Sequence, residues 1–290
     1  HTWLLIIFVS FLFLYYKLKN PLSAGFLIYS KGVGMKQILL VAMYALSLNT
    51  LVAQEEKEEV WRIWYIKPVQ GKAKQLQDGI KDHVAKHHGE GQWPEYYYDV
   101  LSGPNFGSLM GWSGPHTWKA FDERERSQAD VDHWIRYVAP YVDNTQTGTD
   151  FLVFHSDLSY ERPQSDGSWP PIFHLSWNYI GPGRGGDYMD VAKAQVESKT
   201  KNNSENYHRI YHTASGTNPD AWLYEYPVES MEELKKSAGA GGGGGWEKIF
   251  GKAKADELRE KYRSSVRSRM REIIKERKDL SSPAPDQNNN

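Results

Sequence analysis

The sequence contains the same pattern twice, and this internal repeat constrains the fold more than any other feature. The first copy, around Ser102, reads VLSGPNFGSLMGW, and the second, around Ser215, reads TASGTNPDAWLYEY. Each copy has an SGxN turn followed by a short apolar strand. A duplicated unit of this kind can close a symmetric barrel within one chain. The repeat therefore predicts an architecture, but it does not predict a reaction.

The segments around each turn predict the order strand, helix, strand, strand, helix, strand. In the first copy, apolar residues at 73, 76, 80 and 84 share one face of a helix that should stop near Gly89–Gly91. Val131, Trp134, Ile135 and Val138 mark a second helix. The strands of this copy are expected at 60–66, 95–101, 107–112 and 151–160.

The second copy predicts the same order. A helix is expected at 187–201, and strands are expected at 172–180, 206–214, 221–226 and 268–281. The last of these is basic, and its composition alone favours a helix. The predicted fold class is α+β, with two tandem ferredoxin-like (βαββαβ) units forming a pseudo-symmetric α+β barrel.

The register of the two copies sets the domain boundaries. Ser102 and Ser215 are 113 residues apart, whereas Leu158 and Leu280 are 122 apart, so the second copy holds nine extra residues. The glycine run at 239–245 accounts for them as a flexible loop insertion. We assign unit 1 to 54–162, a Pro-rich linker to 163–171, unit 2 to 172–282 and a disordered tail to 283–290.

Residues 35–53 have the charged start, apolar stretch and small-residue end of a secretory signal peptide. Residues 1–34 are interpreted as upstream read-through, and the mature protein is expected to begin at Gln54. An uncleaved N-terminal membrane anchor is the alternative. The prediction is an exported protein, periplasmic or extracellular, with no stable membrane span after signal cleavage.

Composition excludes several classes of protein. The chain has no cysteine, which rules out disulfides, thiolate metal sites and a cysteine nucleophile. Its formal net charge of −1 provides no global field for nucleic acid, and no nucleic-acid partner is predicted. Walker, GxSxG and HExxH motifs are missing from the sequence.

Two tandem ferredoxin-like units, each with a central hairpin turn and a closing segment that ends in Asp-Leu-Ser, resemble the dimeric α+β barrel superfamily. That superfamily includes the antibiotic-biosynthesis monooxygenase, NIPSNAP, EthD-like and chlorite dismutase types. The resemblance covers residues 60–282, and no motif assigns a single family. It implies a barrel made from two joined sheets, with sites in pockets between each sheet and its helices.

Histidines on the predicted strands are the candidate catalytic residues. Period two places His155 with Val153 and Asp157 on one strand face, and His174 with Ser176 and Asn178 on another. One interpretation is hydrogen bonding across a wet barrel interior or a subunit interface. The other is a pocket in which His155 or His174 moves a proton.

Aromatic residues are concentrated in the predicted strands, among 11 tryptophans and 18 tyrosines. They could line a pocket for a flat apolar ligand, or they could simply fill the core. The candidate pocket residues are Tyr98, Trp112, Trp177, Arg209, Tyr211 and Tyr224.

Two separate groups are candidates for a metal site. His83 and His87 are four residues apart on a predicted helix, and His88 adds a third imidazole. Asp130 and His133, with Asp132 between them, form the second group, although Asp130 also suits the N-cap of a helix. No cofactor is predicted from either group. Haem held by His83 or His87 is an alternative implied by the superfamily resemblance.

The predicted function is an exported bacterial envelope protein that binds a small apolar or aromatic ligand. One alternative is a cofactor-independent oxygenase or isomerase that uses a strand histidine, and another is a haem-binding protein. Whether the protein is an enzyme is left open. The expected assembly is a monomer that forms a pseudo-dimer, or a homodimer.

Overall fold

A computed structural model describes residues 58–144, 148–161, 170–234 and 245–283. All of these belong to one compact unit, Lys57–Asn290. The predicted read-through and signal peptide lie outside the described residues, as do most of the linker, nearly all of the glycine run and almost the whole tail.

The first half has the predicted order of elements. Its α3 helix ends at His87, close to the expected glycines. The elements are β1 (Val60–Ile66), α3 (Ala73–His87), β2 (Tyr96–Val100), β3 (Leu109–His116), α4 (Trp118–Glu123), α5 (Gln128–Tyr137), a 3-10 turn (Ala139–Tyr141) and β4 (Gly148–Phe154).

Two local predictions in this half were wrong. The strand predicted at 151–160 ends at Phe154, and a 3-10 turn follows at Ser156–Leu158, so His155 lies just beyond the strand. Asp130, which the sequence suggested as an N-cap, lies inside the helix instead, because the Ser127 side chain accepts a hydrogen bond from the Asp130 backbone N–H and forms the N-cap. Asp130 is therefore in the first turn, and its carboxylate is available for other contacts.

The second half repeats the order. Its last segment, whose composition favours a helix, is a long strand, although it ends at Glu276 rather than at 281. The strand predicted at 206–214 lies at Arg209–Gly216. The elements are β5 (Ile172–Ile180), α6 (Gly185–Lys201), β6 (Arg209–Gly216), β7 (Ala221–Val228), a 3-10 turn (Met231–Glu233), α8 (Trp246–Phe250), α9 (Lys252–Ser265) and β8 (Val266–Glu276).

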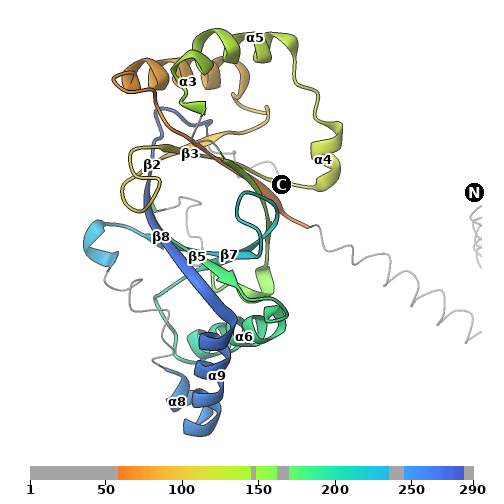
Figure 1. The fold of residues 1–290 in the computed structure, drawn as a ribbon, viewed down its shortest axis with the longest axis vertical. Helices are drawn as coiled ribbons and strands as arrows, with labels where there is room; N and C mark the ends of the chain where they lie inside the picture. The colour runs from red at the N-terminus through yellow and green to blue at the C-terminus, as the bar shows by residue number, and fades with distance from the viewer. Residues whose placement is uncertain (1–57, 145–147, 162–169, 235–244, 284–290) are drawn as a thin grey trace, which may run out of the picture. The chain divides into compact units, whose positions relative to one another are not determined.

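The eight strands form one closed antiparallel barrel in the order β1-β3-β2-β8-β5-β7-β6-β4. The pairs β2–β8 and β4–β6 join the two halves. Helices α3 and α5 lie on one side of the barrel, and α6, α8 and α9 lie on the other (Figure 1). The chain is thus an α+β protein. Among the described helices, none is long and apolar enough to cross a membrane.

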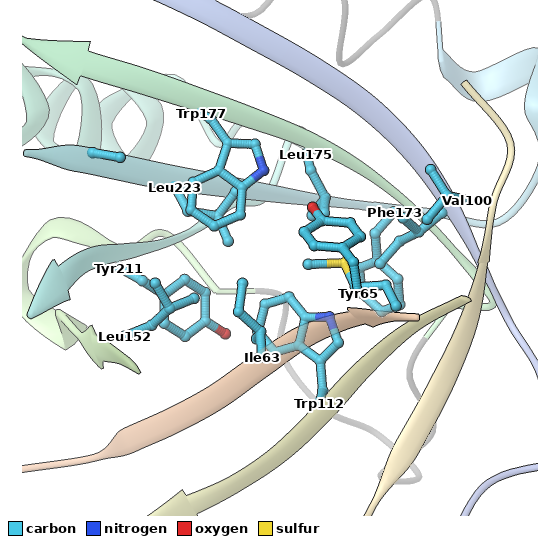
Figure 2. Packing of buried hydrophobic residues seen from close by; sticks show 13 residues of the cluster. Ile63, Tyr65, Val100, Trp112, Leu152, Phe173, Leu175, Trp177, Tyr211 and Leu223 are labelled. Carbon is cyan, nitrogen blue, oxygen red and sulfur yellow. The ribbon is translucent and has the colours of Figure 1, made fainter. Parts of the chain in front are cut away.

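The barrel interior is filled with side chains. Ile63, Trp112 and Trp177 point toward one another from β1, β3 and β5 (Figure 2). Buried carboxylates within the barrel are hydrogen-bonded: the Tyr211 hydroxyl donates to Glu225 at 2.9 Å, and the Tyr65 hydroxyl donates to Glu272 at 2.5 Å. Because the interior is packed, the spaces for a site lie between the sheet and the helices.

Two glycines bring the elements of the first half close together. A Cβ atom at Gly79 of α3 would lie 2.1 Å from the Tyr137 carbonyl oxygen at the end of α5, so only glycine allows the two helices to approach this closely. A Cβ at Gly111 of β3 would lie 2.2 Å from the Trp64 ring, which packs against that strand. The close helix crossing places the later turns of α3 beside the start of α5.

Candidate metal-binding site

Three buried side chains converge where α3 meets α5. The Nε2 atoms of His83 and His88 are 3.3 Å apart, and the Asp130 Oδ1 atom lies 3.4 Å from His83 Nε2. All three residues are less than 7% exposed. A tetrahedral metal ion with ligands at about 2.0–2.2 Å separates neighbouring ligand atoms by about 3.3–3.6 Å. The two shortest separations in this cluster therefore match those of a tetrahedral metal site.

The hydrogen-bond partners of the outer ring nitrogens favour one arrangement of the imidazole protons. His88 Nδ1 is 2.8 Å from the Trp93 carbonyl oxygen, which can only accept, so Nδ1 carries the proton. His133 Nε2 is 3.0 Å from the Asp82 carboxylate and donates to it. Lys86, 3.3 Å from that nitrogen, donates to Asp82 at 2.7 Å instead.

The protonation of His133 in turn determines which nitrogen of His83 carries a proton. With its proton on Nε2, neutral His133 has a lone pair on Nδ1, which accepts a hydrogen bond from His83 Nδ1 at 3.2 Å. His83 and His88 consequently both present unprotonated Nε2 atoms to the Asp130 carboxylate. Three lone pairs then face one another with no proton between them. Such an arrangement is repulsive unless a cation lies at its centre.

Electrostatics keep His83 neutral and Asp130 ionised. Burial, together with the charge of the neighbouring His88, lowers the pKa of His83 to about 3. Burial raises the pKa of Asp130, but Arg126, which donates to both carboxylate oxygens at 3.1 Å, outweighs burial and brings that pKa below its ordinary value. At neutral pH a metal ion would therefore meet a neutral His83 and an ionised Asp130.

A second carboxylate lies at the edge of the cluster. Glu95 Oε1 is 3.8 Å from His88 Nε2, and Glu95 Oε2 accepts a hydrogen bond from the Tyr97 hydroxyl at 2.8 Å. Glu95 is 5% exposed. It could complete the coordination of an ion or hold a water molecule bound to it.

The sequence prediction paired His83 with His87, but the structure pairs His83 with His88. The rings of His83, His87 and His133 form a second group close enough to hold an ion. In this second group, however, His133 Nδ1 already accepts a hydrogen bond from His83 Nδ1. His87 is also more exposed than His83 and His88. We therefore place the candidate site at His83, His88 and Asp130.

The cluster borders a cavity of about 260 Å³ between the outer face of β1 and helices α3 to α5. His83, Glu95 and Arg126 lie in its wall beside the cluster. Trp64 and Trp134 supply aromatic surface, and Arg62 and Arg124 supply positive charge. A small molecule in this cavity would lie next to an ion held by the cluster.

The other predicted strand histidine, His174, lies in the second half. It lines a cavity of about 20 Å³ under α6 and α9, with Ser176 and Asn178, as the period-two pattern predicts. Tyr224, one of the predicted pocket residues, lines the same cavity. Burial lowers the pKa of His174, with a contribution from the charge of Arg271. The role of His174 as a proton shuttle stays a prediction.

The remaining predicted pocket residues lie in the barrel. Trp112, Trp177 and Tyr211 belong to its interior core, and Tyr98 packs against that core. The Arg209 guanidinium lies 4.4 Å from the Phe154 ring centroid and 3.9 Å from the Glu225 carboxylate. The structure thus brings five of the six predicted pocket residues together, apart from Tyr224.

His155 is separate from both cavities. Its Nε2 atom is 2.7 Å from His212 Nδ1, and its ring stacks on Trp222 with the centroids 5.0 Å apart. The ring is half-buried. Its role as a catalytic residue stays a prediction.

Sequence reasoning missed Glu95, Arg62 and Arg124 as site residues. It considered the histidines of α3 and the pair Asp130 and His133 as unrelated groups. A signal was present in Gly79, because a glycine in the middle of an amphipathic helix often marks a close helix contact. Pairing α3 with α5 at that glycine would have joined the two groups.

The fold is that of the dimeric α+β barrel superfamily, as the sequence predicted. A crystal structure described as a candidate monooxygenase from Fusobacterium nucleatum is similar, with a TM-score of 0.52 and 11% identity over 76% of this chain and 93% of that one. A candidate monooxygenase from Lactobacillus acidophilus has a TM-score of 0.50 and 9% identity over 79% and 97%. Anthrone oxidase-like and chlorite dismutase-like proteins match with lower scores.

At these identities the likeness establishes the fold and no single family. No protein-family model and no curated protein sequence matches the chain. A haem-binding protein from Thermus thermophilus also matches, with a TM-score of 0.41 and 15% identity over 77% of this chain and 92% of that one.

Haem fits neither the cavity beside His83 nor the cavity beside His174. Ligand pockets for drug-sized molecules span about 300–1,000 Å³. The cavity beside His174 measures about 20 Å³ and the cavity beside His83 about 260 Å³, both below that range. His83 is also buried among His88, His133 and Asp130, so a porphyrin could not reach its Nε2 atom without displacing them.

Proposed function

We propose that the protein binds one divalent first-row metal ion through His83 Nε2, His88 Nε2 and Asp130 Oδ1. The observation that carries the proposal is the convergence of three unprotonated donor atoms in a buried site. Each histidine is held from behind by a hydrogen bond at its other ring nitrogen, an arrangement typical of imidazoles that ligate metals.

The donor set favours a functional site over a purely structural one. Two imidazoles and one carboxylate leave coordination positions open, as in non-haem iron(II) oxygenases and catalytic zinc sites. When bound, such an ion would supply Lewis acidity or a place to activate oxygen or water. The cavity beside the cluster gives a substrate access to those positions.

The reaction class we propose is oxygenation of a small aromatic ligand. Two proteins of the same fold carry the description of candidate monooxygenase, which supports this class by analogy of fold only. Trp64 and Trp134 give the cavity aromatic walls. Glu95 is buried at the boundary between cluster and cavity, where it can exchange a proton with a bound ligand.

Two further features belong to this proposal. The equal order of elements in the two halves supports a tandem duplication of a ferredoxin-like unit, which forms a pseudo-dimer within one chain. Export through the signal at 35–53 is the second, and N-terminal sequencing of the mature protein checks it: we expect a start at Gln54.

Metal content of the purified protein tests the central proposal. After stripping with a chelator and dialysis against Zn²⁺, or against Fe²⁺ without oxygen, we expect one ion per chain by plasma mass spectrometry. His88→Gln should retain less than a tenth of that amount. His155→Gln, which alters another half-buried histidine paired with a histidine, should bind as the wild type does. Equal binding by His88→Gln and the wild type would refute the proposal.

A further inference from the structure

The cavity beside the metal-binding cluster is lined by more cations than carboxylates, since three arginines share its wall with the single carboxylate of Glu95. Arg62 on β1 and Arg124 after α4 both line it. Among the described residues, neither guanidinium has a carboxylate within ion-pair distance. The third arginine of the wall, Arg126, is occupied by its paired hydrogen bonds to Asp130.

Both free arginines are held in place by aromatic rings. The Arg62 guanidinium lies 4.4 Å from the Trp64 ring centroid, and the Arg124 guanidinium lies 4.4 Å from the Trp93 ring centroid. Stacking on an indole leaves the edge of a guanidinium, where its N–H donors lie, open to a ligand. The Nε atom of Arg62 is buried and has no hydrogen-bond partner in the described protein.

These two cations repel each other without a ligand. Burial lowers the pKa of Arg124, and the charge of Arg62 lowers it further. An unpaired donor in a buried position costs free energy that a ligand would recover. An anion between the two guanidinium groups would offset their repulsion and accept hydrogen bonds from the unused N–H donors.

We propose that this cavity binds a small aromatic carboxylate, with its carboxylate between Arg62 and Arg124 and its ring against Trp134 and the edge of Trp64. The planar fork of a guanidinium matches a carboxylate in two parallel hydrogen bonds. The volume of about 260 Å³ limits the ligand to a size below that of most drugs. This inference deepens the proposed function, because it names the substrate class of the same site.

Calorimetric titration with benzoate tests the inference, with benzamide as its neutral isostere and inorganic phosphate as the other oxyanion. We expect benzoate to bind at least about tenfold more tightly than benzamide, because charge-assisted hydrogen bonds exceed neutral ones. Arg124→Gln and Arg62→Gln should each lower the affinity for benzoate by about tenfold or more. Arg267→Gln, which removes an exposed arginine of β8, should leave binding unchanged.

The titration separates this inference from the metal proposal when it is run with metal-free and metal-loaded protein. If the protein binds benzoate but takes up no metal when it is loaded, the carboxylate site stands and the metal site is contradicted. Metal binding with equal affinity for benzoate and benzamide would overturn the carboxylate site alone. Phosphate binding without benzoate binding would also overturn it. Circular dichroism of each variant confirms that a loss of binding is not a loss of fold.

Discussion

His83 and His88 direct their Nε2 atoms at each other across 3.3 Å, although both atoms lack a proton. His88 Nδ1–H donates a hydrogen bond to the Trp93 carbonyl oxygen, and His83 Nδ1–H donates one to His133 Nδ1. The protein thus positions two buried lone pairs beside the Asp130 carboxylate. This relationship is the basis of the metal-binding account, and four predictions depend on it or on the surrounding fold.

Metal binding should stabilise the folded protein, because the three ligands come together only when α3 packs against α5. A free Zn²⁺ concentration a hundredfold above the dissociation constant adds about 2.7 kcal/mol to the free energy of unfolding. Urea unfolding with Zn²⁺ and with a chelator measures the difference. His88→Gln should show no response, and a full response in that variant would place the ion elsewhere.

Asp82 should tune the affinity for metal without touching the ion, since it accepts the Nε2 proton of His133. Asp82→Asn weakens that hydrogen bond, so His133 is held less firmly and orients the His83 ring less precisely. We expect metal affinity to fall by about tenfold or more. Asp78→Asn is the matched control, because Asp78 is also on α3 and, within the described part of the chain, pairs only with Lys74. Equal affinities in the two variants would contradict the role of Asp82.

Gly79→Ala should destabilise the protein, although alanine favours helices over glycine by about 1 kcal/mol. The added Cβ would meet the Tyr137 carbonyl oxygen and force α3 away from α5. We expect a loss of about 1–3 kcal/mol in unfolding free energy and weaker metal binding. Gly186→Ala in α6 meets nothing within 4 Å and should be neutral or stabilising. A stabilised Gly79→Ala variant would show that the helix contact is looser than described.

Lys199 should make stability depend on pH. Burial lowers its pKa from 10.5 to about 7 in the folded protein, where its Nζ lies 2.6 Å from His208 Nδ1. Between those two pKa values the unfolded chain holds more protons, so stability rises with pH from about 7 toward 10.5.

Lys199→Met should remove this rise, lowering the slope of unfolding free energy between pH 8 and 10 by about 1.4 kcal/mol per pH unit. Urea unfolding at several pH values measures the slope. Lys201→Met alters an exposed lysine of the same helix that pairs with Glu197, and it should leave the slope unchanged. An unaltered slope in Lys199→Met would mean that this lysine stays charged in the fold.

Much of the fold could be predicted from local patterns in the sequence. The SGxN sequence at Ser102 lies in the β2–β3 connection, and the one at Ser215 ends β6 and leads into the β6–β7 connection. The register of the copies identifies β8 despite its helical composition. Period two placed His174, Ser176 and Asn178 on one face. It could not decide that this face lies outside the barrel, because alternation is identical for both faces of a strand.

The candidate site was less predictable, because it is formed by tertiary packing. His83 and Asp130 are distant in sequence and meet only through the helix crossing at Gly79. The choice of His88 over His87 depends on the Trp93 carbonyl oxygen, which binds His88 Nδ1. Trp93 lies in the segment after α3, where the sequence has no periodic pattern that would predict this contact. Arg62 lies on a strand whose pattern gives no sign of an unpaired charge.

X-ray absorption spectroscopy of the zinc-loaded protein tests the central claim most directly. The account predicts one zinc ion per chain, with nitrogen and oxygen ligands at about 2.0–2.2 Å and outer-shell scattering from two imidazoles. His88→Gln should lose the ion, or retain it with scattering from a single imidazole. A wild-type spectrum that shows only water and carboxylate oxygens, with no imidazole, would contradict the account.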